Sequence, residues 1–386
     1  MWQESSETST ELRSGLTTGS CATACCVAAC RALFAKDYPN AVDINLPRGQ
    51  VVTLTLTDYR TLTDAGSADK IQGVRVATIK DAGDDPDATH GATVFVELRL
   101  VQQPGVVFKA AQGVGTVTKT GLLLDVGEPA INPVPRKMIQ EHLQRYALMH
   151  DYQGGFEVSV GVENGEAIAL KTMNGRLGII GGLSILGTTG IVRPFSCAAY
   201  IASIRQGVDV ASANGATHIA ASTGSSSEDA IRKLYQLDEM RLIEMGDFVG
   251  ALLKHLKKGQ VDQLSICGGF GKMTKLAQGE LDLNSRSSSI DFGFIAQCFA
   301  QLLDSHSDYD KEQKETLIEQ VKSANTSIDA LNLSEQHRLP LAALICEKAQ
   351  QHAQKIVAAN VQVEVLAINR KGIIIARSQP LADRQI

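Results

Sequence analysis

The segment Gly15-Leu-Thr-Thr-Gly-Ser-Cys21 places small residues and hydroxyl groups just before a stretch that we expect to be helical. Thr17, Thr18 and Ser20 suit the cap of that helix, and Gly19 allows a ligand to approach the backbone closely. Such a helix N-terminus can hold a carboxylate, because its free N–H groups and its dipole favour negative charge. The three hydroxyl residues are therefore candidate substrate contacts, and an ordinary capped helix is the alternative.

The densest group of carboxylates is Asp81-Ala-Gly-Asp-Asp-Pro-Asp87. Such a loop can bind a cation, hold a cationic ligand or supply a general base. The adjacent Asp84 and Asp85, stiffened by Pro86, are the candidate catalytic residues. The spacing is not that of an EF-hand, so a calcium loop is not expected. An exposed turn is the alternative interpretation.

The strongest local pattern is Gly178-Ile-Ile-Gly-Gly-Leu-Ser-Ile-Leu-Gly-Thr-Thr-Gly190. An apolar strand that runs into glycines and hydroxyls before a helix is how α/β sheets hold nucleotides and sulfonium cofactors. The pattern predicts cofactor binding by seven of its residues, which are Gly181, Gly182, Ser184, Gly187, Thr188, Thr189 and Gly190.

Two other glycine-containing segments follow predicted strands. Ala221-Ser-Thr-Gly-Ser-Ser-Ser-Glu228 could bind ligand hydroxyls, or could be a flexible serine loop. Ile266-Cys-Gly-Gly-Phe-Gly-Lys272 imitates a phosphate-binding loop, but it has Ile at its first position and Met after the lysine. The sequence contains neither GxGxxG nor GxxxxGK[ST], which weakens a kinase-type interpretation.

A stiff segment, Asp125-Val-Gly-Glu-Pro-Ala-Ile-Asn-Pro-Val-Pro-Arg-Lys137, contains three prolines. It displays Glu128, Asn132 and Arg136, and a loop of low entropy positions such polar groups accurately. These three residues are therefore candidate substrate contacts.

The clustered cysteines predict packing rather than metal binding. Cys21, Cys25, Cys26 and Cys30 fall at about 0°, 40°, 140° and 180° around a helix, so two pairs face opposite sides. They cannot form one four-thiolate site, and the sequence has no HxH or HExxH pattern. We therefore expect no metal held by the protein, and only Cys21, in the first turn, to be reactive.

Composition narrows the class of protein. Apolar residues make up 44% of the chain and charged residues 20%, with a net charge of −5, which excludes disorder, collagen and coiled coil. A mildly acidic chain without basic runs is a poor candidate for nucleic-acid binding. No signal peptide and no apolar stretch of membrane-spanning length is expected. A reduced cytoplasmic enzyme is the leading class.

The pattern of elements predicts two domains. Residues 1–153 are expected to form an α+β domain, with helices at 21–36 and 133–150 and strands at 42–46, 51–57, 73–79 and 92–100. Residues 154–386 are expected to form an α/β, Rossmann-like domain with a mostly parallel sheet and ligands at the strand C-termini. This second domain would open with a hairpin of 156–162 and 166–172, continue with the glycine-rich run, and carry a helical excursion at 304–336.

Taken in order, four motifs resemble the cobalt-precorrin-5B C1-methyltransferase family (CbiD) of anaerobic cobalamin biosynthesis. They are Thr17-Thr-Gly-Ser-Cys-Ala22, Asp81 to Asp87, Gly127 to Arg136, and Arg176 to Val192, and the resemblance covers most of 12–292. It implies transfer of a methyl group from S-adenosylmethionine to C-1 of a cobalt corphinoid, giving cobalt-precorrin-6A. Cobalt then arrives as part of the substrate.

The resemblance also implies a substrate that carries many carboxylates. Arg136, Lys137, Arg193 and Lys272, in a cleft between the domains, would match them. The chain departs from the family at Gly268-Gly-Phe-Gly-Lys272 and at Leu283-Asn-Ser285, where histidines are common. Two other classes stay open: a corrinoid-binding protein without catalytic activity, and a small-molecule enzyme that handles phosphate. Transient contacts with neighbouring pathway enzymes are expected.

Overall fold

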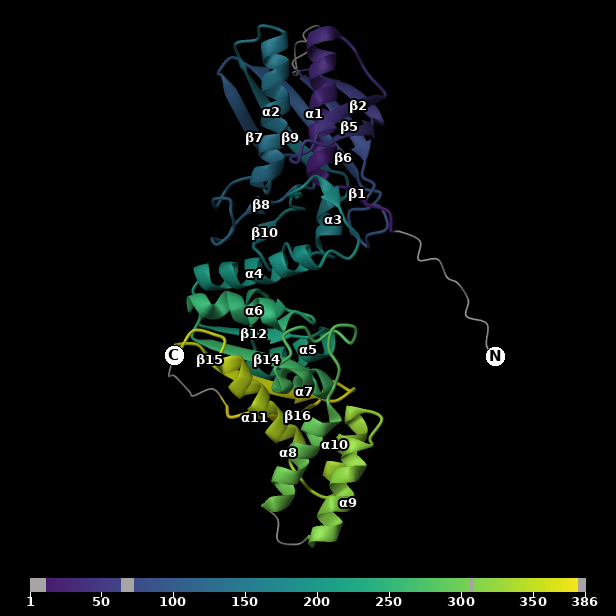
Figure 1. Ribbon diagram of the computed structural model, residues 1–386. Coiled ribbons are helices and arrows are strands. Elements are labelled where there is room, and N and C mark those ends of the chain that lie inside the picture. The colour runs from purple at the N-terminus through teal and green to yellow at the C-terminus, as the bar shows by residue number, and fades with distance from the viewer. Residues whose placement is uncertain (1–11, 64–72, 306–308, 381–386) are drawn as a thin grey trace, which may run out of the picture. The chain divides into compact units, whose positions relative to one another are not determined.

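The computed structural model describes residues 12–63, 73–305 and 309–380, and divides the chain into two compact units (Figure 1). Unit 1 ends at Ser196 and unit 2 begins at Cys197. The boundary expected between residues 153 and 154 is therefore wrong. Strand β9 (Gly155–Val162) lies between β6 (Thr93–Val101) and β7 (Gly105–Ala110), inside the main sheet of unit 1.

Unit 1 contains a five-stranded sheet in the order β4-β5-β6-β9-β7, in which only β7 and β9 run parallel. Its α+β character agrees with the prediction, although β4 and β7 were not expected. The remaining bounds are β1 Gly15–Leu16, β2 Ala41–Asn45, β3 Val51–Thr55, β4 Asp58–Leu62, β5 Gly73–Ile79, β8 Thr116–Val117, α3 Gly165–Ala169, β10 Ile179–Ile180 and β11 Ile191–Val192. The expected strand at 166–172 is wrong, because α3 occupies much of it.

Two helices, α1 (Thr18–Ala35) and α2 (Pro133–Met149), pack against each other, and α1 covers β5 and β6. Small residues and thiols fill α1, so it can approach the sheet closely. Contrary to the sequence-based expectation, α1 is long and apolar enough to cross a membrane by length and composition. However, 78% of that stretch is buried inside the structure, as in the core helix of a soluble protein.

Unit 2 contains a sheet in the order β13-β12-β14-β15-β16, with four parallel strands and an antiparallel β16. The mixed α/β character and the mostly parallel sheet agree with the prediction. The bounds are α4 Cys197–Ala213, β12 His218–Ser222, α5 Ser225–Tyr235, β13 Leu242–Glu244, α6 Val249–His255, β14 Gln263–Gly269, α7 Phe270–Gln278, α8 Phe292–Asp304, α9 Lys311–Lys322, α10 Ser327–Gln336, α11 Leu341–Gln354, β15 Gln362–Ile368 and β16 Ile374–Arg377.

Alternation along the strands separates two faces of this sheet. Ile219 and Ala221 of β12 belong to the large core that also contains residues of α4, α6, α7 and α11. Ala220, between them, packs with Ile231 of α5 in a smaller core on the other face. Helices therefore cover both faces, as a mostly parallel sheet requires.

Candidate functional site

Two short strand pairs gather the predicted motifs of unit 1 around the N-terminus of α1. Strand β1, just before α1, pairs with β11 at the end of the glycine-rich run. The N–H of Thr17 donates to the carbonyl of Gly190 at 3.1 Å, and that of Gly19 donates to Leu186 at 3.1 Å. The N–H of Leu16 donates to the carbonyl of Asp81 at 2.8 Å, which adds the acidic loop.

The glycine-rich run therefore lies in unit 1, and the strand–loop–helix expected in the second domain is wrong. Strand β10 lies in the run and β11 follows it, each with only two residues, and α4 begins after Ser196. Several glycines are needed for packing. A Cβ at Gly187 would lie 2.4 Å from Thr17 Oγ1, and one at Gly182 would lie 2.3 Å from the carbonyl oxygen of Gly113. Cofactor binding by the seven residues stays a prediction, without its original structural argument.

The cap hydroxyls of α1 are buried and already bonded within the protein. Ser20 Oγ donates to the carbonyl of Gly190 at 2.7 Å, and Thr18 Oγ1 accepts from the N–H of Leu186 at 3.0 Å. Thr17 Oγ1 accepts from the N–H of Ser20 at 3.2 Å. The geometry thus favours a role in holding the glycine-rich run in place over direct contact with substrate.

Each aspartate of the acidic loop has a defined partner. Asp84 accepts from the backbone N–H of Arg13 at 2.6 Å, and Asp85 accepts from that of Phe195 at 2.9 Å. Asp81 pairs with the Arg13 guanidinium, which lowers the pKa of Asp81 to about 2. The loop is therefore bonded to Arg13, just before β1, and to Phe195, just after β11. It thus belongs to the group of motifs around the N-terminus of α1, which we call the motif assembly, and is not an independent surface turn.

The acidic loop also forms an ion pair with a buried lysine, which the sequence did not predict. Lys80 is 1% exposed, and its Nζ lies 2.7 Å from Asp87 Oδ2. Although burial acts in the opposite direction, hydrogen bonds from Lys80 and Thr89 lower the pKa of Asp87. A lysine at the end of a strand and seven residues before an aspartate gave no signal of this pairing.

The proline-rich segment joins the same assembly through its backbone. The N–H of Asn132 donates to Ile185 at 3.0 Å, and Pro135 lies beside Gly19. Arg136 binds Glu128 at 2.7 Å and donates to the carbonyl of Ile131 at 2.7 Å. Arg136 and Glu128 therefore stiffen the segment, and a substrate carboxylate would have to compete with Glu128 for the guanidinium.

The burial of Cys21 contradicts the expectation that it is reactive. All four cysteines of α1 are buried and none forms a disulfide. Burial raises the pKa of the Cys21 thiol to about 12, so the thiolate is scarce near neutral pH. The thiols act as small core side chains.

In unit 2, two of the segments singled out in the sequence lie at the carboxyl ends of parallel strands. The serine-rich segment follows β12, and Gly268-Gly269 lead from β14 into α7. Lys272 forms an ion pair with Asp247, and the side-chain amide of Asn284 donates to the same carboxylate at 3.1 Å. Lys272 thus belongs to a polar cluster within unit 2.

Comparisons with known proteins bear on both units. Residues 5–194 match the family model CbiD, and residues 282–379 match the model of the CbiD C-terminal domain. A cobalt-precorrin-5B C(1)-methyltransferase of Marinomonas sp. (strain MWYL1) is 59% identical, covering 98% of this chain and 97% of its own length. The chain belongs to the CbiD family.

A second relative agrees with this membership. A cobalt-precorrin-5B C(1)-methyltransferase of Paraburkholderia phytofirmans is 55% identical over 98% of this CbiD chain and all of its own length. The crystal structure of the cobalamin biosynthesis protein CbiD from Archaeoglobus fulgidus is 26% identical and covers 72% of this chain and 83% of that chain, with a TM-score of 0.38.

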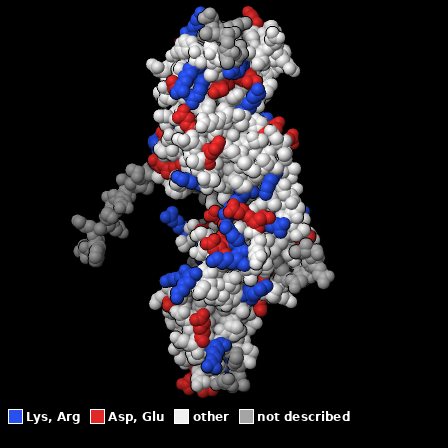
Figure 2. All heavy atoms as spheres, turned by 180° about the vertical axis from the view of Figure 1, so that it is seen from behind, with Lys and Arg blue, Asp and Glu red and all other residues white. Residues whose placement is uncertain are grey.

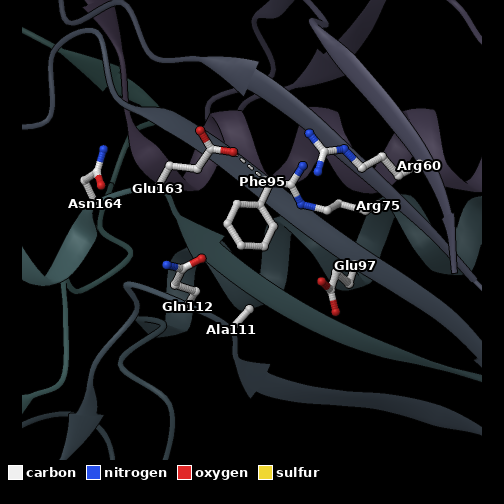
Figure 3. A pocket seen from close by; sticks show the side chains of 8 residues that line it. All are labelled: Arg60, Arg75, Phe95, Glu97, Ala111, Gln112, Glu163 and Asn164. Atoms are coloured by element: carbon white, nitrogen blue, oxygen red, sulfur yellow. Dashed lines mark hydrogen bonds and ion pairs between the residues drawn. The ribbon is translucent and has the colours of Figure 1, made fainter.

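The CbiD chain also has a polar hollow that no motif indicated. It has a volume of about 500 Å³ and lies on the face of the unit 1 sheet opposite α1 (Figure 3). Arg75 lies 4.0 Å above the Phe95 ring and bridges Asp58 and Glu163. The hollow is lined by Arg60, Arg75, Phe95, Glu97, Ala111, Gln112, Glu163 and Asn164. Basic and acidic side chains are likewise interspersed over the face of the molecule seen in Figure 2.

Proposed function

We propose that the chain transfers a methyl group from S-adenosylmethionine to C-1 of cobalt-precorrin-5B, giving cobalt-precorrin-6A. One observation carries the proposal. The CbiD match spans residues 5–194, and all four motif segments within that range meet around the N-terminus of α1. The relatives match 98% of the chain, and their names support methyl transfer to C-1 of cobalt-precorrin-5B.

S-adenosylmethionine supplies the methyl group as an activated sulfonium, so the protein has no leaving group to create. C-1 provides the electron pair of the new C–C bond, the electrons of the broken C–S bond stay on sulfur, and a proton leaves the macrocycle. The work of the residues is alignment, which can contribute about 7–11 kcal/mol of the barrier in well-oriented systems.

Asp84 and Asp85 are the proposed proton acceptors. Each carboxylate uses one oxygen to hold a backbone N–H, which fixes its direction, and the other oxygen accepts no hydrogen bond from the described residues. A carboxylate held in this way can accept a proton without first being oriented.

Substrate binding is proposed for polar residues of both units. Arg193 is exposed, next to β11, and suits a substrate carboxylate. Glu128, Asn132 and Arg136 lie on the stiffened proline-rich segment, while Lys272 lies in unit 2. Thr17, Thr18 and Ser20 would act by fixing the glycine-rich run. Cobalt enters with the substrate.

We also propose that the parallel sheet of unit 2 binds a nucleoside in the manner of a Rossmann-like fold. The protein is expected to act in the cytoplasm and to meet neighbouring pathway enzymes only transiently.

Anaerobic single-turnover assays with cobalt-precorrin-5B and S-adenosylmethionine test the proposal. Methylated product and S-adenosylhomocysteine should form in equal amounts. Corrinoid binding without turnover would indicate a carrier. Tight ATP binding together with no S-adenosylmethionine binding would indicate a phosphate-handling enzyme. Either result would contradict the proposed methyl transfer.

A further inference from the structure

The parallel strands of unit 2 have a point at which their order reverses. The chain runs through β12, β13, β14 and β15, but the sheet has the order β13-β12-β14-β15. The chain therefore passes from β12 to β13 on one side of β12, and then returns to β14 on the other side of β12. In open α/β sheets, ligands bind outside the carboxyl ends of the strands at such a switch point.

A buried hydroxyl at this edge has no partner. Ser222, the last residue of β12, is 1% exposed, and its Oγ forms no hydrogen bond with the described residues. Alternation along β12 places Ser222 on the same face as Ala220, which packs against α5. The hydroxyl is therefore directed beneath the N-terminal end of α5, where a ligand could satisfy it.

Two glycines at the same edge have open space where a side chain would lie. Gly224 and Gly269 occupy the N-cap positions of α5 and α7, and neither supplies a side-chain hydrogen bond to its helix. A Cβ built on either residue would meet no heavy atom within 4 Å. Neither glycine is needed for internal packing, in contrast to Gly187 in unit 1.

An acidic side chain completes the arrangement. Glu244 ends β13, is exposed, and lies opposite Ser222 in the sheet register. In βαβ nucleoside sites, an acidic residue at the end of the second strand binds the ribose hydroxyls. Burial, followed by the charges of Glu244 and Asp247, raises the pKa of Tyr200 to about 12, so negative charge is present at this edge.

We propose that this edge of unit 2 binds the adenosyl methyl donor. Glu244 accepts hydrogen bonds from the ribose hydroxyls, Ser222 bonds a polar group of the donor, and the first turn of α5, after Gly224, faces its carboxylate. The glycine-rich run of unit 1 then has a role in packing and in binding the substrate. This inference rests on the proposed function for the identity of the donor, and the position of the site rests on unit 2 alone.

Calorimetry with S-adenosylhomocysteine on the full chain tests the position. Ser222→Ala should weaken binding several-fold while the unfolding temperature stays unchanged or rises, because the variant removes a buried unpartnered hydroxyl. Gly224→Val should weaken binding at least tenfold without loss of fold, because its side chain enters open space. Glu244→Gln should weaken binding about tenfold.

Gly175→Val is the matched control, since Gly175 in unit 1 also has no heavy atom within 4 Å of its Cβ position. It should bind S-adenosylhomocysteine as the wild type does. Wild-type affinity in folded Ser222→Ala, Gly224→Val and Glu244→Gln would overturn this position while leaving the proposed reaction intact. Failure of the wild type itself to bind, with AMP or ATP bound instead, would overturn the proposed methyl transfer as well.

Discussion

At the scale of single residues, the side chains most constrained in unit 1 are buried charges and thiols. The ammonium of Lys80 is nearly inaccessible and depends on Asp87 for its counter-charge. The sequence could nominate the acidic loop by its composition. It could not show that Asp87 pairs with the preceding strand, because that pairing depends on the turn between them.

We expect Asp87→Asn to destabilise the protein by about 3 kcal/mol, because it leaves the buried Lys80 charge unpaired. Urea unfolding at neutral pH measures this. Glu141→Gln, which removes an exposed pair with Lys137 at 3.8 Å, is the control and should cost less than about 1 kcal/mol. An equal loss of unfolding free energy in the two variants would contradict the role of Asp87 as the counter-charge of Lys80.

The ion pair between Lys80 and Asp87 predicts that the stability of the protein depends on pH. The folded-state pKa of Asp87 is lowered, so its contribution to stability is fully present above its unfolded pKa near 3.8 and is lost as the pH falls through the folded value. The stability difference between wild type and Asp87→Asn should therefore shrink below about pH 4. If the stability difference between wild type and Asp87→Asn grew at acidic pH, the ionised carboxylate of Asp87 could not be its source.

Thiol labelling tests the burial of the cysteines. Cys197 is exposed, whereas the other seven cysteines are buried. Iodoacetamide should therefore modify Cys197 in the native protein and the remaining seven only after unfolding, as counted by mass spectrometry. Rapid native labelling of Cys21 would contradict the raised pKa of its thiol.

At the scale of elements, local patterns were sufficient for most helices and for the parallel sheet of unit 2. They failed where long-range pairing decides the structure. The glycine-rich run has the local pattern of a nucleotide loop, but its short strands pair with β8 and β1, far away in the sequence. Strand β9 likewise follows a linker-like Gly-Gly pair and yet completes the unit 1 sheet.

Because the glycine-rich run is packed within unit 1, the expected effect of Gly187→Val changes. A loop that contacts only a cofactor would tolerate the substitution in the unliganded protein. Here the residue has a φ of +138° and packs against Thr17, so we expect a loss of about 3 kcal/mol in unfolding free energy. Thermal unfolding compares it with Gly175→Val, and unchanged stability of Gly187→Val would contradict the packing described for the motif assembly.

At the scale of the whole molecule, the proposed proton acceptors are carboxylates that also hold the backbone. Asp85→Asn keeps an oxygen that can accept from the N–H of Phe195 but removes the proton acceptor. We expect the methyl-transfer rate to fall at least about tenfold, or roughly 1.4 kcal/mol in the barrier. Asp85→Ala, which loses both functions, should be slower still. Wild-type single-turnover rates in both variants would make the loop purely structural.

The most direct test of the central claim is an anaerobic incubation of the purified chain with cobalt-precorrin-5B and S-adenosylmethionine carrying a ¹³C-labelled methyl group. The account predicts a corphinoid heavier by one labelled methyl group, with the label bonded to C-1 in the NMR spectrum, and S-adenosylhomocysteine in equal amount. Unchanged macrocycle after prolonged incubation, or a label at any other carbon, would contradict it.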